Sequence, residues 1–140
     1  MENFKKVIFL ETFKKPIKCG DLSNKEKTLL QESINILLKE NIDNKFFFKK
    51  IIEKFRNIKP FNLIETSSQF DEVLKEINIV DEEDVYLIWE YPSDIDKIVL
   101  KYLIKHWEDI WFSASDEAVV LFFPKSKRLV LITHYNTVYF

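Results

Sequence analysis

Residues 118–133 read AVVLFFPKSKRLVLIT, and this stretch decides the fold more than any other part of the chain. It contains two runs of β-branched, aromatic and other apolar residues, Ala118–Phe123 and Leu129–Thr133, separated by Pro124-Lys-Ser-Lys127. Such runs, bounded by turn residues, are typical of strands. A polar break of only a few residues favours a hairpin over a crossover, so the two strands are predicted to pair antiparallel.

The rest of the second half extends this pattern in both directions. Asp84–Tyr91 is rich in β-branched and aromatic residues and stops at Pro92, which predicts another strand. Strand-like runs also occur at Asp109–Phe112 and Thr137–Phe140. Between Asp84–Tyr91 and Asp109–Phe112, Ser93 to about Ile104 fits a helix capped by Ser93. The sequence therefore predicts an antiparallel meander that ends at the C-terminus.

The first half has helical rather than strand periodicity. Ser23-x-x-Glu26 has capping-box spacing and precedes a helix predicted over about residues 24–40. Asp43 is a candidate cap for a second helix that ends before Pro60, and Ser68-x-x-Asp71 is a candidate start for a third. Val7–Phe13 fits either a strand or a helix. We therefore predict an α+β fold, a single domain over residues 1–140 with N-terminal helices packed on one face of a C-terminal antiparallel β-sheet.

The composition excludes several classes of protein. The chain has one cysteine, Cys19, so it forms no internal disulfide and no multi-cysteine zinc site. Its only glycine is Gly20, whereas phosphate-binding loops need several, so no nucleotide cofactor is expected. The sequence contains no run of about 18 apolar residues, so no membrane-spanning helix is expected. The apolar run Val7–Leu10 is too short for a signal peptide, which favours a cytoplasmic location.

The charges are distributed very unevenly along the chain. Residues 1–66 carry 14 Lys or Arg against 9 Asp or Glu, and residues 67–140 carry 7 against 14. All 14 acidic residues of the second half lie between Asp71 and Glu117, where only four lysines oppose them. A field of this kind steers a basic partner and raises its association rate. The pI near 5.8 argues against nucleic acid as the partner.

No catalytic motif accompanies these carboxylates. His106 and His134 have no second histidine or cysteine near them in the sequence, and nothing next to Cys19 supplies a base. We predict no catalytic residue, no metal ligand and no cofactor. A small metal-dependent hydrolase, using Asp/Glu clusters with His134, remains an alternative. A structural or regulatory module that associates through an open sheet edge is another.

The C-terminal region carries a resemblance to a known class of proteins. From Trp111 to Pro124, and again from Leu129 to Tyr139, an aromatic residue, a Ser-Asp turn, an apolar strand, a Pro turn, a second apolar strand and an aromatic end follow one another. This succession is similar to the C-terminal part of small bacterial immunity proteins, which are encoded beside polymorphic toxins and contact-dependent growth-inhibition toxins. The resemblance covers about 30 residues and implies stoichiometric inhibition by binding, without catalysis.

Together these observations predict an immunity protein that neutralises a cognate toxin domain, a basic nuclease-type protein, through an acidic surface. The partner is a protein rather than a nucleic acid or a membrane, and the oligomeric state stays open. The residues predicted to contact the partner are Asp81, Glu82, Glu83, Asp84, Asp94, Asp96, Asp116 and Glu117, with Tyr91 and Trp111 as candidate aromatic anchors. For both aromatic residues, a place in the core is the competing interpretation and the favoured one.

Overall fold

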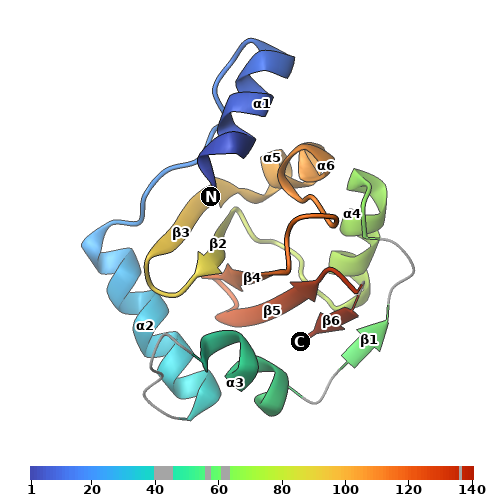
Figure 1. Ribbon diagram of the computed structural model, residues 1–140. Coiled ribbons are helices and arrows are strands. Elements are labelled where there is room, and N and C mark those ends of the chain that lie inside the picture. The colour runs from blue at the N-terminus through green and yellow to red at the C-terminus, as the bar shows by residue number, and fades with distance from the viewer. Residues whose placement is uncertain (40–45, 56–57, 61–63, 136) are drawn as a thin grey trace.

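The protein is built around one antiparallel sheet whose strands do not follow one another in sequence order. The computed structural model describes residues 1–39, 46–55, 58–60, 64–135 and 137–140. The sheet has six strands in the order β1-β6-β5-β4-β2-β3 (Figure 1). The strands are β1 (Ile58–Pro60), β2 (Asp84–Glu90), β3 (Asp94–Val99), β4 (Ala118–Phe123), β5 (Arg128–Thr133) and β6 (Thr137–Tyr139).

Helices occupy most of the remaining chain. They are α1 (Asn3–Phe13), α2 (Asn24–Leu38), α3 (Phe47–Lys54), α4 (Ser67–Glu76), α5 (Leu100–Lys105) and α6 (Trp107–Ile110). The predicted α+β class is therefore confirmed, with helices first and an antiparallel sheet towards the C-terminus. The predicted meander is present as β4-β5-β6, in which each strand pairs antiparallel with the next.

The prediction that the helices cover one face of the sheet is wrong, because both faces are covered. Alternate residues of β4 point to opposite sides, so Val119 and Leu121 enter one core and Val120 and Phe122 enter the other. The first core includes residues of α4, α5 and α6, and the second includes residues of α2 and α3. This explains why residues 119–123 form a continuous apolar run instead of alternating with polar residues.

Two predicted elements have the wrong secondary structure. Ser93 to Ile104, predicted as one helix, contains strand β3 and only then the short helix α5. Strand β2 pairs with β3 from Asp84↔Val99 to Glu90↔Asp94, with a register shift between Ile88 and Glu90, and this tertiary pairing outweighs local propensity. Asp109–Phe112, predicted as a strand, instead overlaps α6.

The reason for the α6 error is visible in its side chains. Trp107, Ile110 and Trp111 have the i, i+3, i+4 spacing of one helix face, and all three are buried. Trp107 stacks on Phe70 of α4 with ring centroids 3.9 Å apart. Its indole N–H donates to the carbonyl of Ile64 at 3.0 Å.

The helix boundaries differ from expectation in smaller ways. The capping box of Ser23 and Glu26 opens α2 as predicted. The N-cap of helix α4 is Thr66, two residues before the predicted Ser68. Thr66 and Gln69 form the capping box in place of Ser68 and Asp71. The predicted cap Asp43 lies outside the described residues. Helix α3 ends at Lys54, before the short strand β1, and Val7–Phe13 is helical as part of α1.

Candidate functional site

The carboxylates predicted to form one acidic surface are divided between two ends of the sheet. Strands β2 and β4 run antiparallel with Tyr86 opposite Phe122, so residues 81–84 lie near the end of β4. Asp116 and Glu117 immediately precede its beginning. Six residues of strand span roughly 20 Å. The two groups therefore cannot contact one small partner surface at the same place.

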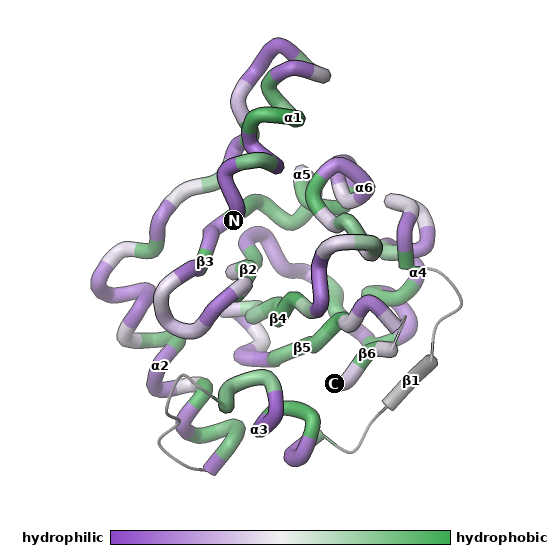
Figure 2. The backbone as a smooth tube through the Cα atoms, in the orientation of Figure 1, coloured by the Kyte–Doolittle hydropathy of each residue, from purple (hydrophilic) through white to green (hydrophobic). Residues whose placement is uncertain are grey.

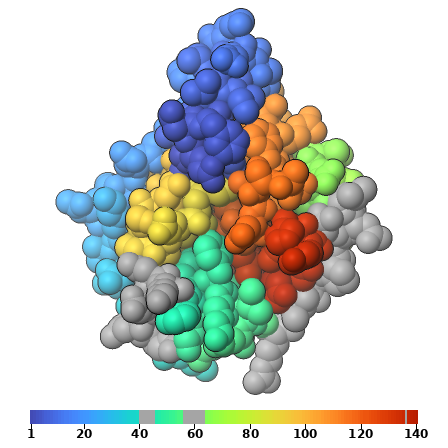
Figure 3. Space-filling model, in the orientation of Figure 1, coloured from blue at the N-terminus to red at the C-terminus, as the bar shows by residue number. Residues whose placement is uncertain are grey.

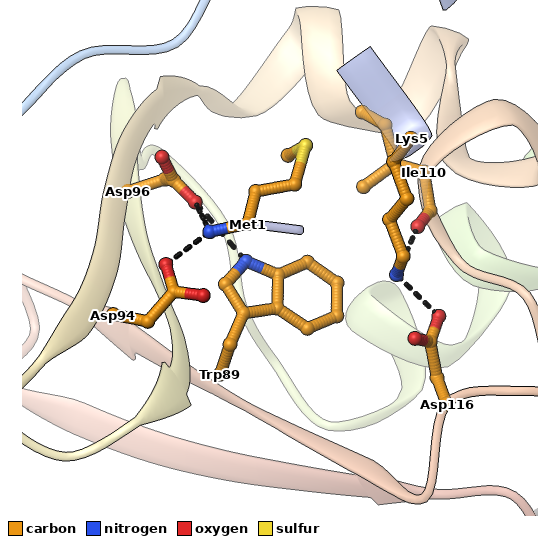
Figure 4. A network of polar contacts seen from close by, with 7 residues as sticks. All are labelled: Met1, Lys5, Trp89, Asp94, Asp96, Ile110 and Asp116. Carbon is orange, nitrogen blue, oxygen red and sulfur yellow. Dashed lines mark hydrogen bonds and ion pairs between the residues drawn. The ribbon is translucent and has the colours of Figure 1, made fainter. Parts of the chain in front are cut away.

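The group that contains Asp116 also includes Asp94 and Asp96 of β3, and these carboxylates bind cationic groups of the N-terminal segment (Figure 4). The α-amino group of Met1 lies against the carboxylates of Asp94 and Asp96, and its distance to the Asp96 carboxylate is 2.6 Å. The indole N–H of Trp89 donates to the same Asp96 carboxylate at 3.1 Å. Asp96 is only 6% exposed, so its carboxylate interacts with these two groups of the protein itself.

A second buried ion pair attaches the same helix to the body. Lys5 of α1 is 1% exposed, and its Nζ donates to Asp116 Oδ2 at 2.5 Å and to the carbonyl of Ile110 at 3.0 Å. The ammonium group also lies 4.0 Å from the centre of the Trp89 ring. Burial lowers the pKa of Lys5, although Asp116 opposes that shift. We call Met1, Lys5, Asp94, Asp96 and Asp116 the N-terminal anchor.

The two candidate aromatic anchors belong to the core, as the competing interpretation held. Tyr91 is 7% exposed and stacks on Phe47 with centroids 4.6 Å apart. Trp111 is 3% exposed and stacks on Trp107. Burial raises the pKa of Tyr91. Neither ring presents enough surface to anchor a partner.

The second group, near the end of β4, includes a buried carboxylate with a positioning role. Glu82 is 8% exposed and accepts hydrogen bonds from the backbone N–H groups of Lys125 at 3.2 Å and Ser126 at 2.8 Å. In return, Lys125 Nζ donates to the carbonyl of Asp81 at 2.8 Å. Glu82 thus ties the segment before β2 to the β4–β5 turn, and both of its carboxylate oxygens are engaged inside the protein.

Further contacts hold the segment before β2 against β5 and α4. Arg128 donates through Nη1 to the carbonyls of Ile77 at 2.8 Å and Asn78 at 3.2 Å. The N–H of Ile79 donates to the carbonyl of Leu74 in α4 at 2.8 Å. The positive φ angles of Asn78 and Asp81 are accommodated within these contacts. We call residues 78–83 the acidic loop, and its backbone is fixed on both sides.

The acidic loop presents an exposed apolar side chain next to two exposed carboxylates. Val80 is 62% exposed, and Asp81 and Glu83 are also exposed. The next carboxylate, Asp84, is half-buried and lies 3.5 Å from Lys97 Nζ. An apolar centre with a charged rim is the usual anatomy of a protein–protein contact. Sequence reasoning chose the carboxylates of this loop but missed Val80, since a single valine beside acidic residues gives no periodic signal.

A polar network on the other face of the sheet was also missed. Glu26 caps α2, and its carboxylate accepts from Lys97 Nζ at 2.7 Å and from the Tyr86 hydroxyl at 3.1 Å. The hydrogen bonds from Lys97 and Ser23 lower the pKa of Glu26 to about 2. Burial and the neighbouring Glu26 raise the pKa of Tyr86 to about 12. The network links α2 to β2 and β3.

Among the residues that the structure describes, the remaining titratable groups form no recognisable reactive set. His134 Nδ1 lies 3.0 Å from the carbonyl of Glu117, and His106 Nδ1 lies 3.3 Å from Asp109. Burial raises the pKa of Cys19, which makes its thiol less nucleophilic. Within the described ranges, no group of three His, Cys, Asp or Glu side chains is arranged to hold a metal ion.

No protein-family model, no curated protein and no solved structure matches this chain. Across the part of the chain that the structure describes, none of the helices has both the length and the apolar character needed to cross a membrane.

Proposed function

We propose that this protein is an inhibitor of the immunity class, which binds a basic toxin domain through the acidic loop and blocks it without catalysis. The observation that carries the proposal is the loop itself. Val80, Asp81 and Glu83 are exposed within four consecutive residues, and Glu82 and Arg128 hold the backbone of this segment. A surface that is already ordered loses little conformational entropy on binding.

The charges of the loop indicate the chemistry of the partner. Asp81 and Glu83 attract lysines and arginines, and Val80 needs a small apolar pocket beside those basic groups. Proteins that act on nucleic acids carry such basic surfaces, because they bind phosphate groups. An acidic inhibitor associates rapidly with them through long-range attraction. The resemblance of residues 111–139 to immunity proteins supports the same class, and a cytoplasmic location follows from it as an expectation.

The metal-dependent hydrolase has no comparable support. His134 contacts a backbone carbonyl, and Asp94, Asp96 and Asp116 are occupied by the cations of the N-terminal anchor. Three of the carboxylates that this alternative could use are therefore engaged in holding the N-terminal segment.

The test is a binding experiment with the toxin domain encoded beside this protein. In one variant Asp81→Lys and Glu83→Lys are combined, and in a second Val80 is replaced by Asp. We expect the double charge reversal to slow association at least about tenfold and to weaken its dependence on salt. Val80→Asp should mainly speed dissociation, because it removes the apolar contact.

The matched control is Glu72→Lys with Glu108→Lys. It reverses two exposed carboxylates on α4 and α6, outside the acidic loop. We expect toxin binding by this control to resemble that of the unchanged protein at equal ionic strength. Equal loss of binding in both double variants would show that only net charge matters. Unchanged binding by the loop variants would place the interface elsewhere.

A further inference from the structure

Helix α1 carries an apolar surface that the rest of the protein leaves uncovered. Its side chains at Val7, Ile8 and Leu10 are 45%, 45% and 48% exposed, and Phe4 and Phe13 beside them are 41% and 38% exposed. Within the helix only Lys5 and Phe9 are buried. Figures 1 and 3 show α1 standing away from the sheet, and Figure 2 shows the hydrophobic stretch along it.

This surface is large enough to need an explanation. The side of a helix that faces water is normally polar, whereas the outer side of α1 carries several apolar side chains. The five partly exposed side chains leave roughly 400 Å² of apolar area in contact with water, which is the size of patch that commonly marks an interaction site. The contacts of the N-terminal anchor hold the inner side of α1 on the body, so its outer side is the one available to another molecule.

The outer side offers one pair of apolar residues spaced like the a and d positions of a two-stranded coiled coil. Val7 and Leu10 have the spacing of heptad positions a and d, and a β-branched residue at a with leucine at d favours two strands. Lys6 and Glu11 then occupy the flanking positions g and e, and both are exposed. In two parallel helices, position g of one chain lies beside position e of the next heptad in the other. Lys6 is therefore placed to pair with Glu11 of a second copy, and the reverse pair forms by symmetry.

We propose that α1 is the interface of a homodimer, in which the outer sides of two α1 helices pack in parallel about a twofold axis along the helices. The area argues for a weak, concentration-dependent dimer. A standard interface buries about 800 Å² on each partner, and α1 supplies about half of that as apolar surface. The N-terminal anchor lies at the start of β4 and the acidic loop at its end, so dimerisation leaves the acidic loop accessible.

The test is sedimentation velocity of the full chain over a wide range of concentration. The unchanged protein should shift from monomer to dimer as its concentration rises. Replacing Val7 and Leu10 together by Asp should weaken the dimer at least about a hundredfold. The control is Ile36→Asp in α2, which places an aspartate at an apolar side chain that is 75% exposed outside α1. It should leave dimerisation unchanged.

A charge exchange tests the parallel arrangement. Lys6→Glu and Glu11→Lys should each weaken the dimer several-fold, and the two together should restore it, because the ion pairs then form with opposite polarity. Circular dichroism of each variant establishes that it is folded. These surface exchanges leave the N-terminal anchor intact, so they remain informative if the Asp variant unfolds.

Three results would overturn the proposal. The first is a monomer at every concentration. The second is a dimer that is insensitive to the changes at Val7, Leu10, Lys6 and Glu11. The third is a monomer that binds vesicles of anionic phospholipid and loses that binding when Val7 and Leu10 are replaced, which would assign the surface to a membrane interface.

Discussion

The ion pair between Lys5 and Asp116 allows a quantitative test of how α1 is held. The two charged groups are 2.5 Å apart, and their side chains are 1% and 5% exposed. At that distance an effective dielectric constant of about 20 gives an attraction of roughly 6–7 kcal/mol, most of which the desolvation of both groups offsets. The net worth of the pair is therefore small. Removing only one partner is costly, because a charge is left buried without its counterion.

We expect Asp116→Asn and Lys5→Met each to lower the free energy of unfolding by about 3–5 kcal/mol. The double variant should lose no more than the larger single loss, because it leaves no buried charge unpaired. Urea denaturation followed by circular dichroism measures all three values. Lys75 and Asp71 provide the control, since they are also 2.5 Å apart but are 68% and 36% exposed. Lys75→Met should cost less than about 1 kcal/mol.

The reasoning depends on burial rather than on distance. It would be refuted if the buried and exposed pairs gave the same loss, or if the two single losses at Lys5 and Asp116 simply added in the double variant. In either case the N-terminal anchor would be too open to water for its charges to matter.

Three further predictions concern the other polar contacts. Glu82→Ala should lower the free energy of unfolding by about 1–3 kcal/mol and speed amide exchange at Lys125, because the turn loses its acceptor; hydrogen exchange measures this. Glu26 has its pKa lowered from 4.5 to about 2, so its contribution to stability is complete above pH 4.5 and is lost as the pH falls towards 2; acid denaturation of Glu26→Gln should lack that component. Tyr86 should ionise near pH 12 in a spectrophotometric titration, and Glu26→Gln should lower its pKa; a Tyr86 signal near pH 10 in the unchanged protein would contradict the contact.

The strands could be predicted from the sequence where the local signal and the tertiary pairing agree. Ala118–Phe123 and Leu129–Thr133 are apolar throughout, and the break between them has the length of a hairpin loop. The sequence could not reveal that both faces of this sheet are covered, because a continuous apolar run fits a buried strand regardless of what packs on it. The prediction for the residues of strand β3 was wrong for a different reason. Asp96 lies inside the fold with Trp89 and the Met1 amine as partners, and a buried aspartate interrupts any hydrophobic pattern.

The acidic surface could likewise be predicted only in part from the sequence. The excess of carboxylates between residues 71 and 117 is real, but its meaning depends on partners that are distant in the chain. Asp116 pairs with Lys5, and Glu82 accepts from the turn at Lys125 and Ser126. Contacts over such separations leave no trace in local spacing. Only Asp81, Glu83 and Glu117 among the predicted contact residues are exposed rather than buried or half-buried, so counting charges overestimated the surface available to a partner.

The order of helices and strands along the chain has a consequence for biosynthesis. Helix α2 buries Leu30, Ile34 and Leu38 against strands that are made much later, up to Leu131 of β5. At about 5–20 residues per second, a ribosome needs roughly 5–20 s to add the intervening residues. During that interval the apolar side of α2 has no sheet to pack against, so the nascent chain exposes a hydrophobic surface that a ribosome-associated chaperone can bind. Native packing of this half of the protein must then wait until translation has almost reached the last strand.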